Sequence, residues 1–289
     1  MHRVIWLRLL RPKQWSKNVL VLAAPGAAGV LGDADAIVDT AIAFVAFCAV
    51  ASGTYCWNDA LDVDEDRAHP IKARRPVAAG EITCTQAMVV GSALIGAGLA
   101  VSLVANWHLT AVVGGYAGLT LLYSALWKHV AVVDLVVIAT GFLLRTIAGG
   151  VAVDVEISTW FLIVAGAGSL FMVTGKRHAE QVELGDGAGA HRASLDEYTT
   201  SYLAFVRAVA TSVAILAYVL WAFEQSAGTG NELPFQLSIV PFVMGLLRYA
   251  LLVEQGTGGA PEDVVMSDRT LQLIGAAWVL TFALGVSGH

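Results

Sequence analysis

Charged side chains are scarce in this chain, and their scarcity is the first guide to its class. Asp, Glu, Lys and Arg together make up 14% of the 289 residues, whereas a soluble domain carries about 25%. The mean hydropathy is +0.68 and 57% of the residues are hydrophobic, which excludes an ordinary soluble globular protein. Cysteine is also rare: Cys48, Cys56 and Cys84 show no metal-ligand spacing, so we expect free thiols.

The N-terminus lacks the features of a signal peptide. The segment MHRVIWLRLLRPKQWSKN is basic and amphipathic and has no small-residue cleavage site after a short apolar core. We interpret it as an interfacial helix that leads into a first membrane span.

Long apolar runs dominate the rest of the chain. Each run approaches the ~20 residues that cross about 30 Å of hydrocarbon. Nine can be marked, at residues 18–32, 36–57, 84–105, 109–127, 131–151, 157–175, 202–222, 235–253 and 270–287. Because they lack the alternation of barrel strands, we predict an all-α integral membrane protein with nine transmembrane helices in a single polytopic membrane domain, residues 1–289.

Positive charge is absent from one side of this predicted topology. The connections at 32–36, 106–108 and 223–234 contain no Lys or Arg. Of the 17 Lys and Arg residues, all except Arg145 and Arg248 lie in or beside the N-terminal segment and the loops after the second, fourth, sixth and eighth spans. By the positive-inside rule we expect a cytoplasmic N-terminus and an external C-terminus.

The loop after the second span carries the strongest chemical signal. If the helix continues past Trp57, Asn58, Asp62 and Asp66 lie at i, i+4 and i+8 and share one face. An amide oxygen and two carboxylates at this spacing suit Mg²⁺, which keeps several waters and is completed by substrate phosphates. Tyr55 projects from the same face, and we expect it to contact substrate.

A solvated acidic turn is the alternative interpretation of this loop. Against it, the carboxylates crowded between Asp59 and Asp66 repel one another unless a cation compensates, although we expect Asp59 and Asp64 to point away from the metal. Basic residues follow at once, namely Arg67, Lys72, Arg74 and Arg75. Acid for a metal beside base for phosphate is the pairing that magnesium-diphosphate chemistry needs, and we expect Lys72 and Arg75 to bind substrate.

The motif N-x-x-x-D-x-x-x-D at residues 58–66 resembles the first aspartate-rich motif of the UbiA family of intramembrane prenyltransferases. The chain is more narrowly similar to the decaprenyl-phosphate phosphoribosyltransferase branch of that family. This similarity rests on RPKQWSKN (11–18), NDALDVDEDRAHPIKARRP (58–76), YSALWKH (123–129), GFLLRTIAGG (141–150) and GKRHAEQ (175–181).

The resemblance implies a fold and an activity. It implies a UbiA-like helical bundle around a central cavity, with cytoplasmic loops 58–83 and 176–201 over an active site that faces the cytoplasm from the plasma membrane. It also implies transfer of the ribosyl unit of phosphoribosyl diphosphate to a polyprenyl phosphate, with Mg²⁺ as cofactor, for cell-wall arabinan precursors. The expected partners are these two substrates and the membrane, with no nucleic acid; a homo-oligomer stays open.

The second acidic motif of the wider family is replaced here by basic residues. Lys176, Arg177 and His178 stand in its place, and Glu180 and Glu183 remain. A site that meets the phosphates of both substrates should be richer in Lys and Arg, so this departure favours the narrower branch.

Further residues are expected at the site. We expect catalytic roles for Asn58, Asp62 and Lys176, and substrate contacts for Lys17, Tyr123, Lys128, Arg145, Arg177, Glu180 and Arg192 as well. Lys17 has snorkelling and Tyr123 ordinary packing as its alternative. Arg145, deep in the fifth span, either pairs with Asp134 or Asp154 or faces a polar cavity.

The expected mechanism is charge neutralisation and positioning. Mg²⁺ and nearby cations stabilise the leaving diphosphate, and the anionic lipid phosphate attacks C1 without a general base. Two other functions are open from sequence: transfer of a prenyl chain to an aromatic acceptor, and transport through a pore lined by Arg145.

Overall fold

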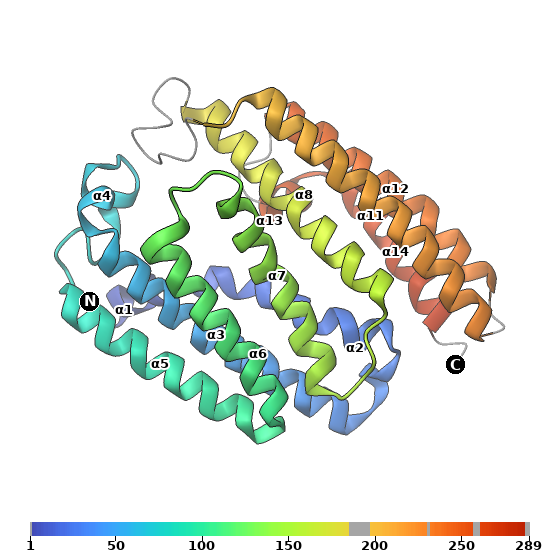
Figure 1. Cartoon of the computed structure of the whole chain (residues 1–289), viewed down its shortest axis with the longest axis horizontal. Coiled ribbons are helices and arrows are strands. Elements are labelled where there is room, and N and C mark those ends of the chain that lie inside the picture. Colours follow the sequence, from blue (N-terminus) through green and yellow to red (C-terminus); the bar gives the residue numbers. More distant parts are fainter. Residues whose placement is uncertain (1, 185–196, 230–231, 257–260, 287–289) are drawn as a thin grey trace. The chain divides into compact units, whose positions relative to one another are not determined.

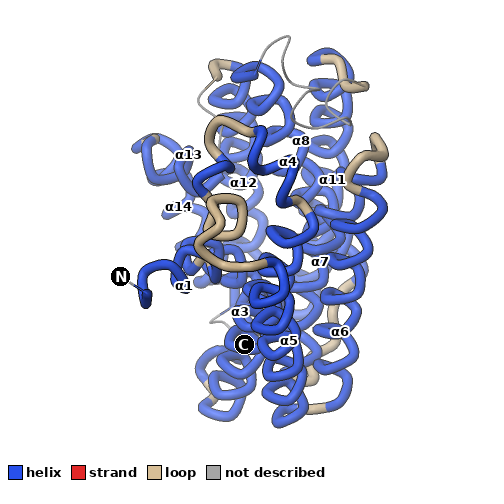
Figure 2. The backbone as a smooth tube through the Cα atoms, turned by 90° about the vertical axis from the view of Figure 1, so that its left-hand side faces the viewer, coloured by secondary structure: helices blue, strands red, loops and turns tan. Residues whose placement is uncertain are grey.

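The fold is described from a computed structural model that covers residues 2–184, 197–229, 232–256 and 261–286. Within these residues the regular structure is helical throughout, as the sequence predicts (Figure 2). The chain divides into two compact units, Met1–Val137 with Leu144–Glu156, and Ile138–Leu143 with Ile157–His289. The helix α7 (Val133–Ala152) is divided between them. The expectation of a single membrane domain stays a prediction.

Eight helices are long and apolar enough to cross a membrane, so this is a multi-pass membrane protein. They are Ala34–Leu61, Cys84–Ala105, Trp107–Trp127, Val133–Ala152, Thr159–Val182, Thr200–Ala227, Leu233–Glu254 and Arg269–Val286. These helices overlap the second to the ninth apolar segments marked in the sequence.

The first predicted span, residues 18–32, folds as shorter pieces. A 3₁₀ helix, η1 (Pro12–Leu22), leads into α2 (Ala23–Ala27) and then into the single turn η2 (Val30–Gly32). With rises of about 2.0 Å per 3₁₀ residue and 1.5 Å per α residue, η1 and α2 together reach about 30 Å, near the thickness of a bilayer core. A ninth crossing, the cytoplasmic N-terminus and the central cavity stay predictions.

The first unit is built around α3, which packs along α5 with α6 beside both (Figure 1). Besides η1, α2 and η2, its elements are α1 (His2–Leu10), α3 (Ala34–Leu61), α4 (Val63–Ala68), η3 (Lys72–Arg74), α5 (Cys84–Ala105), α6 (Trp107–Leu122) and the π-helical turn η4 (Tyr123–Trp127).

Glycines allow α3 and α5 to meet backbone to backbone. A Cβ on Gly53 of α3 would lie 2.6 Å from the carbonyl oxygen of Gly91, and a Cβ on Gly91 would lie 2.8 Å from the carbonyl oxygen of Gly53. Small residues at such a seam are the usual means of close helix packing in membranes. The seam fixes the C-terminal end of α3, where the acidic motif begins.

The second unit is a set of long helices side by side (Figure 1). Its elements are α8 (Thr159–Leu184), α11 (Thr200–Thr229), α12 (Glu232–Glu254), α13 (Pro261–Ser267) and α14 (Arg269–Val286). The helix α11 packs along α8 and α12, and α12 packs along α14. Phe171, Tyr249 and Val253 are buried together where α8 meets α12.

Candidate metal and phosphate site

The acidic motif lies at the junction of α3 and α4. The helix α3 ends at Leu61, Asp62 departs from ideal helical geometry with φ −95° and ψ 11°, and α4 begins at Val63. Two hydrogen bonds keep the helical spacing through this junction: the Asp62 N–H donates to the Asn58 carbonyl at 2.9 Å, and the Asp66 N–H donates to the Asp62 carbonyl at 2.8 Å. The predicted continuation of the helix is therefore confirmed in spacing, with a local departure at Asp62.

Asn58 and Asp62 meet as the sequence predicts. The Asn58 side-chain amide donates to Asp62 Oδ2 at 2.7 Å, while Asn58 Oδ1 accepts from the hydroxyl of Ser124 at 3.1 Å. Ser124 lies in η4, where the Lys128 N–H donates to the Tyr123 carbonyl five residues earlier. This wide turn, a form common at functional sites, brings α6 and its extension against the motif.

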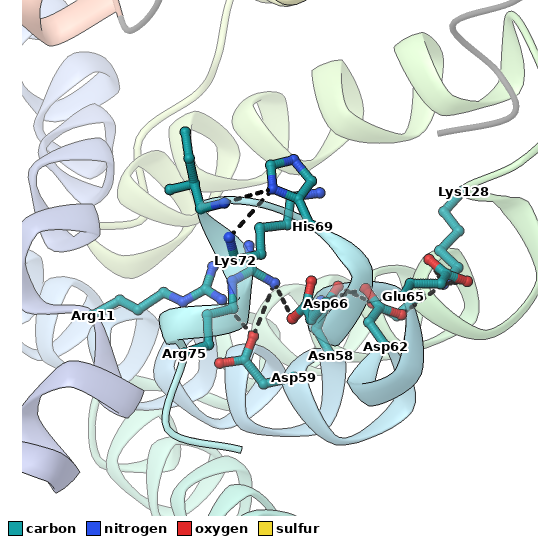
Figure 3. Close-up of polar contacts among 12 residues, drawn as sticks. Arg11, Asn58, Asp59, Asp62, Glu65, Asp66, His69, Lys72, Arg75 and Lys128 are labelled. Carbon is teal, nitrogen blue, oxygen red and sulfur yellow. Dashed lines mark hydrogen bonds and ion pairs between the residues drawn. The ribbon is translucent and has the colours of Figure 1, made fainter. Parts of the chain in front are cut away.

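Lys128 is the cation held by this half of the motif. Its Nζ donates to Asp62 Oδ1 at 2.6 Å and to Glu65 Oε1 at 3.0 Å (Figure 3). Burial by itself would lower the pKa of the Lys128 ammonium, but its hydrogen bonds to Asp62 and Glu65 more than offset burial and raise the pKa above the ordinary value. Lys128 therefore stays protonated at physiological pH beside the predicted metal ligand.

Asp66 belongs to a second cluster, together with Asp59. Arg75 Nη1 donates to Asp66 Oδ2 at 2.6 Å and to Asp59 Oδ1 at 3.3 Å (Figure 3). The carboxylate of Asp59 is 1% exposed and also binds Arg11. Arg11 in turn lies over the ring of Tyr55, with 4.9 Å from its Cζ to the ring centroid. Asp59 does point away from Asn58 and Asp62, but it shares its cation with Asp66.

Arg11 adopts a backbone conformation that is rare for residues with a side chain. Its φ of 51° and ψ of 59° place it in the left-handed region, between α1 and η1. Such a conformation persists where surrounding contacts over-determine it. The ion pair with buried Asp59 and the contact with Tyr55 supply those contacts, so the N-terminal segment is fastened to the acidic motif.

The donor set fits a magnesium ion that substrate completes. Within the described part of the chain, no three or more His, Cys, Asp or Glu side chains form a ready cage, because cations hold the carboxylates. Asn58 and Asp62 nevertheless adjoin each other and offer the hard oxygen donors that Mg²⁺ takes alongside water and phosphate. One carboxylate oxygen nearby, Asp59 Oδ2, is buried with no hydrogen-bond partner among the described residues.

The remaining predicted residues of the first unit lie in varied surroundings. Tyr123 is buried in η4. Lys72 is half-buried in η3, and its backbone N–H donates to His69 Nδ1 at 3.3 Å. Lys17 is half-buried in η1. Their contacts with substrate stay predictions.

Arg145 is buried within the first unit and is 5% exposed. Its Nε donates to Asn18 Oδ1 and its Nη2 donates to the hydroxyl of Tyr116, both at 2.8 Å. The neighbouring backbone is close as well, because a Cβ on Gly149 would overlap the carbonyl oxygen of Val21. Neutral partners thus take up part of the cost of this intramembrane cation, and its contact with substrate stays a prediction.

The predicted basic residues of the second unit lie near the end of α8. Arg177 is 2% exposed and its Nη1 donates to Glu180 Oε2 at 2.6 Å, while Lys176 Nζ lies 3.7 Å from Glu180 Oε1. Glu180 is thus a partner of both cations. Arg192, also predicted to bind substrate, lies outside the described residues.

Sequence reasoning did not place Arg11, Asp59, Glu65 or Ser124 at the site. Arg11 opens the RPKQWSKN motif and Asp59 lies inside the acidic motif, so the sequence signal for both residues was their place in these motifs. Glu65 follows Asp62 by three residues, a helical spacing that would have placed it beside the same cation. Ser124 carries no local signal, because only the tertiary fold brings it to Asn58.

Comparison with known proteins identifies the family of this chain. The sequence profile of the UbiA prenyltransferase family matches residues 19–284. The chain is 46% identical to a decaprenyl-phosphate phosphoribosyltransferase of Corynebacterium glutamicum over 97% of this chain and 86% of the relative. It is 42% identical to one of Mycolicibacterium smegmatis, over 97% of this chain and 92% of the relative.

A solved structure supports the same fold. A UbiA homolog from Archaeoglobus fulgidus bound to GPP and Mg²⁺ superposes with a TM-score of 0.74 at 17% identity, over 98% of this chain and 99% of that one. At this identity the likeness shows the fold alone. With the family profile matching residues 19–284, it follows that this chain belongs to the UbiA prenyltransferase family.

Proposed function

We propose that this protein transfers the 5-phosphoribosyl group of phosphoribosyl diphosphate to a polyprenyl phosphate and releases diphosphate. The relatives are named for decaprenyl phosphate as the acceptor. The observation that carries the proposal is the 46% identity, over 97% of the chain, to a relative named for this activity. The mixture of acid and base around Asp62 supports it, because a donor with three phosphates needs both a metal and cations.

In this proposal Asn58 and Asp62 hold Mg²⁺, with Asp66 as a further ligand once Arg75 releases it. When bound, the ion supplies positive charge that stabilises the departing diphosphate. The short contacts from Lys128 to Asp62 and from Arg75 to Asp66 support a second role for these cations. Each neutralises a carboxylate of the acidic motif and would turn to a phosphate when substrate binds.

The chemical step needs no general base. The bond from C1 of the ribose to the diphosphate oxygen breaks, and its electron pair leaves with diphosphate. An oxygen of the lipid phosphate, already anionic, forms the new bond to C1 from the opposite face, which inverts the anomeric centre. The protein contributes positioning and fixed positive charge, and we assign Lys176, Arg177, Lys72 and Lys17 to the phosphates on this basis.

The proposed setting is the plasma membrane, with the site facing the cytoplasm. The segregation of Lys and Arg to one set of connections supports this orientation. The lipid product would supply ribosyl units for arabinan precursors of the cell wall.

The test is transfer of label into lipid. Membranes that contain the protein are incubated with radiolabelled phosphoribosyl diphosphate, polyprenyl phosphate and Mg²⁺, and the lipid extract is counted. We expect label in the extract, and no label when polyprenol replaces polyprenyl phosphate. A parallel arm with prenyl diphosphate and an aromatic acid tests prenyl transfer, and product in that arm alone would overturn the proposal.

A further inference from the structure

Arg207 is a buried cation of the second unit whose hydrogen-bonding capacity is only partly used within the described residues. It lies on α11 and is 4% exposed, on the buried face that also carries Leu203 and Ala210. Its Nη2 binds Glu254 at the end of α12. Its Nη1 is buried and has no hydrogen-bond partner among the described residues.

A second polar atom near it is in the same state. His178 on α8 is 7% exposed, and its Nδ1 is buried with no hydrogen-bond partner among the residues that the structure describes. Arg207 is near enough to act electrostatically on this imidazole. Two packed helices, α8 and α11, thus carry unsatisfied polar atoms on residues that are close enough to interact electrostatically.

Unsatisfied buried donors call for a missing partner. Folded proteins pair nearly all buried polar groups, and exceptions coincide with a bound ion, a water or a functional role. A guanidinium with a free Nη and an imidazole that can carry a proton on Nδ1 both donate, so the complementary partner is an anion. The planar fork of Arg suits the oxygens of a phosphate in particular.

Glu254 provides a way in. Its side chain is 51% exposed although its partner Arg207 is buried. A carboxylate that is half in solvent can leave the guanidinium at little desolvation cost, which frees Nη2 and opens the path to Nη1. Glu254 therefore occupies the position that a ligand anion would take.

The surroundings favour the phosphate of a lipid. Arg207 lies about two helical turns from the start of α11, near one end of this candidate membrane-spanning helix. Large apolar side chains on the same face of α12 as Glu254 are exposed, with Leu247 at 56% and Leu251 at 46%. An anionic head group in the place of the Glu254 carboxylate would have its hydrocarbon chain beside this apolar surface.

We propose that Arg207 and His178 form a binding site for a phosphate monoester, namely the head group of the polyprenyl phosphate acceptor, with Glu254 as the counter-ion that the phosphate displaces. This inference rests on the proposed function for the identity of the lipid. The 5-phosphate of the ribosyl donor has the same chemistry and is the alternative source that the experiment separates.

The experiment compares Arg207→Gln, Glu254→Gln and His178→Phe in the full chain, purified into lipid nanodiscs. We expect Arg207→Gln to raise the KM for polyprenyl phosphate about tenfold, the usual scale for one charge-assisted hydrogen bond, with the KM for phosphoribosyl diphosphate within about twofold. His178→Phe, which removes the Nδ1 donor, should act in the same direction. Glu254→Gln should lower the KM for the lipid, because the competing carboxylate is gone.

The Glu254→Gln variant distinguishes a ligand site from a merely structural ion pair. Loss of either partner of a structural pair would reduce the melting temperature and leave the KM values for both substrates unchanged. Arg207→Lys should recover part of the lipid affinity. Arg248→Gln is the matched control, because Arg248 is already bound to Asp268 at 2.6 Å in the same unit, and it should leave both KM values unchanged.

A direct binding measurement keeps the site testable apart from the reaction. Nanodiscs are titrated with fluorescent polyprenyl phosphate or with the matching polyprenol, and we expect binding of the phosphate alone, weakened in Arg207→Gln. Equal binding in wild type and Arg207→Gln, or a changed KM for phosphoribosyl diphosphate only, would overturn the assignment. Phosphate-specific binding without label transfer would overturn the proposed function and leave the site standing.

Discussion

The charged clusters of the two units differ in how their charges are balanced. In the first unit three carboxylates of the acidic motif are paired with cations: Asp62 with Lys128, Asp66 with Arg75, and Asp59 with both Arg11 and Arg75. In the second unit, Arg207 and His178 keep buried polar atoms with no partner among the described residues.

This difference in charge pairing indicates which kind of ligand each unit would bind. A carboxylate cluster that is neutralised by neighbouring Lys and Arg side chains is stable without a bound metal ion, and it can exchange those cations for one. A buried guanidinium with an unsatisfied donor carries a desolvation cost that an anion would relieve. In the first unit, Lys and Arg side chains therefore pair with the carboxylates that a metal ion would bind. In the second unit, a bound anion would pair with the unsatisfied donor.

The largest expected effect comes from removing the charge of Asp62. Asp62→Asn should reduce turnover by at least about 10²–10³-fold, because the proposed metal loses its central carboxylate. The melting temperature in detergent should stay close to that of the wild type. Asp64→Asn is the control, since Asp64 pairs only at the surface, with a side chain that is 90% exposed; turnover retained in Asp62→Asn would remove the metal assignment.

The next largest effect is expected at Asp59, the buried acid that pairs with both Arg11 and Arg75. Asp59→Ala should lower the free energy of unfolding by about 3–5 kcal/mol, because it leaves Arg11 and Arg75 without a buried partner. Arg207→Gln in the second unit should cost less, since it strands no buried carboxylate. Chemical denaturation in detergent gives both values, and a larger loss in Arg207→Gln would contradict the comparison. Arg67→Ala, at an exposed pair, should change stability by less than about 1 kcal/mol.

The glycines test whether the first unit is also the more tightly packed. Gly91→Ala should destabilise by about 1–3 kcal/mol, because its Cβ would lie 2.8 Å from both the carbonyl oxygen of Gly53 and the ring of Trp57. Gly175→Ala in the second unit meets no atom nearer than 3.4 Å, at Val253, and should be neutral or stabilising through helix propensity. Thermal melting of the two variants in the same detergent measures the contrast.

The smallest predicted effect tests whether the Lys128 ammonium occupies the position of the proposed metal ion beside Asp62. Lys128→Met should tighten Mg²⁺ binding by up to about tenfold, on the scale of one partly exposed ion pair, because the ion no longer competes with an ammonium for Asp62. Calorimetric titration with Mg²⁺ reads this out independently of activity, and turnover should fall in the same variant. Lys13→Met, at an exposed lysine, controls for the loss of a charge. Weaker Mg²⁺ binding in Lys128→Met would show that Lys128 does not hold the position of the metal.

Much of the fold could be read from the chain because the signals are local. Apolar runs near the bilayer length predicted eight helices that the structure contains, and the four-residue spacing predicted the contact of Asn58 with Asp62. The short helical pieces of the first predicted span could not be predicted, because hydropathy measures polarity and not whether the backbone forms a 3₁₀ helix or an α-helix. Arg145 was recognised as costly, but its partners Asn18 and Tyr116 come from other helices.

The sequence by itself determined the class of the protein, the helical spacing of its acidic motif and the separation of base from acid along the chain. Only the tertiary structure decided which cation meets which carboxylate. Lys128 reaches Asp62 across 66 residues and Arg11 reaches Asp59 across 48. Helical periodicity fixes neighbours within a few residues, whereas pairs so far apart meet only when packed helices bring their ends together.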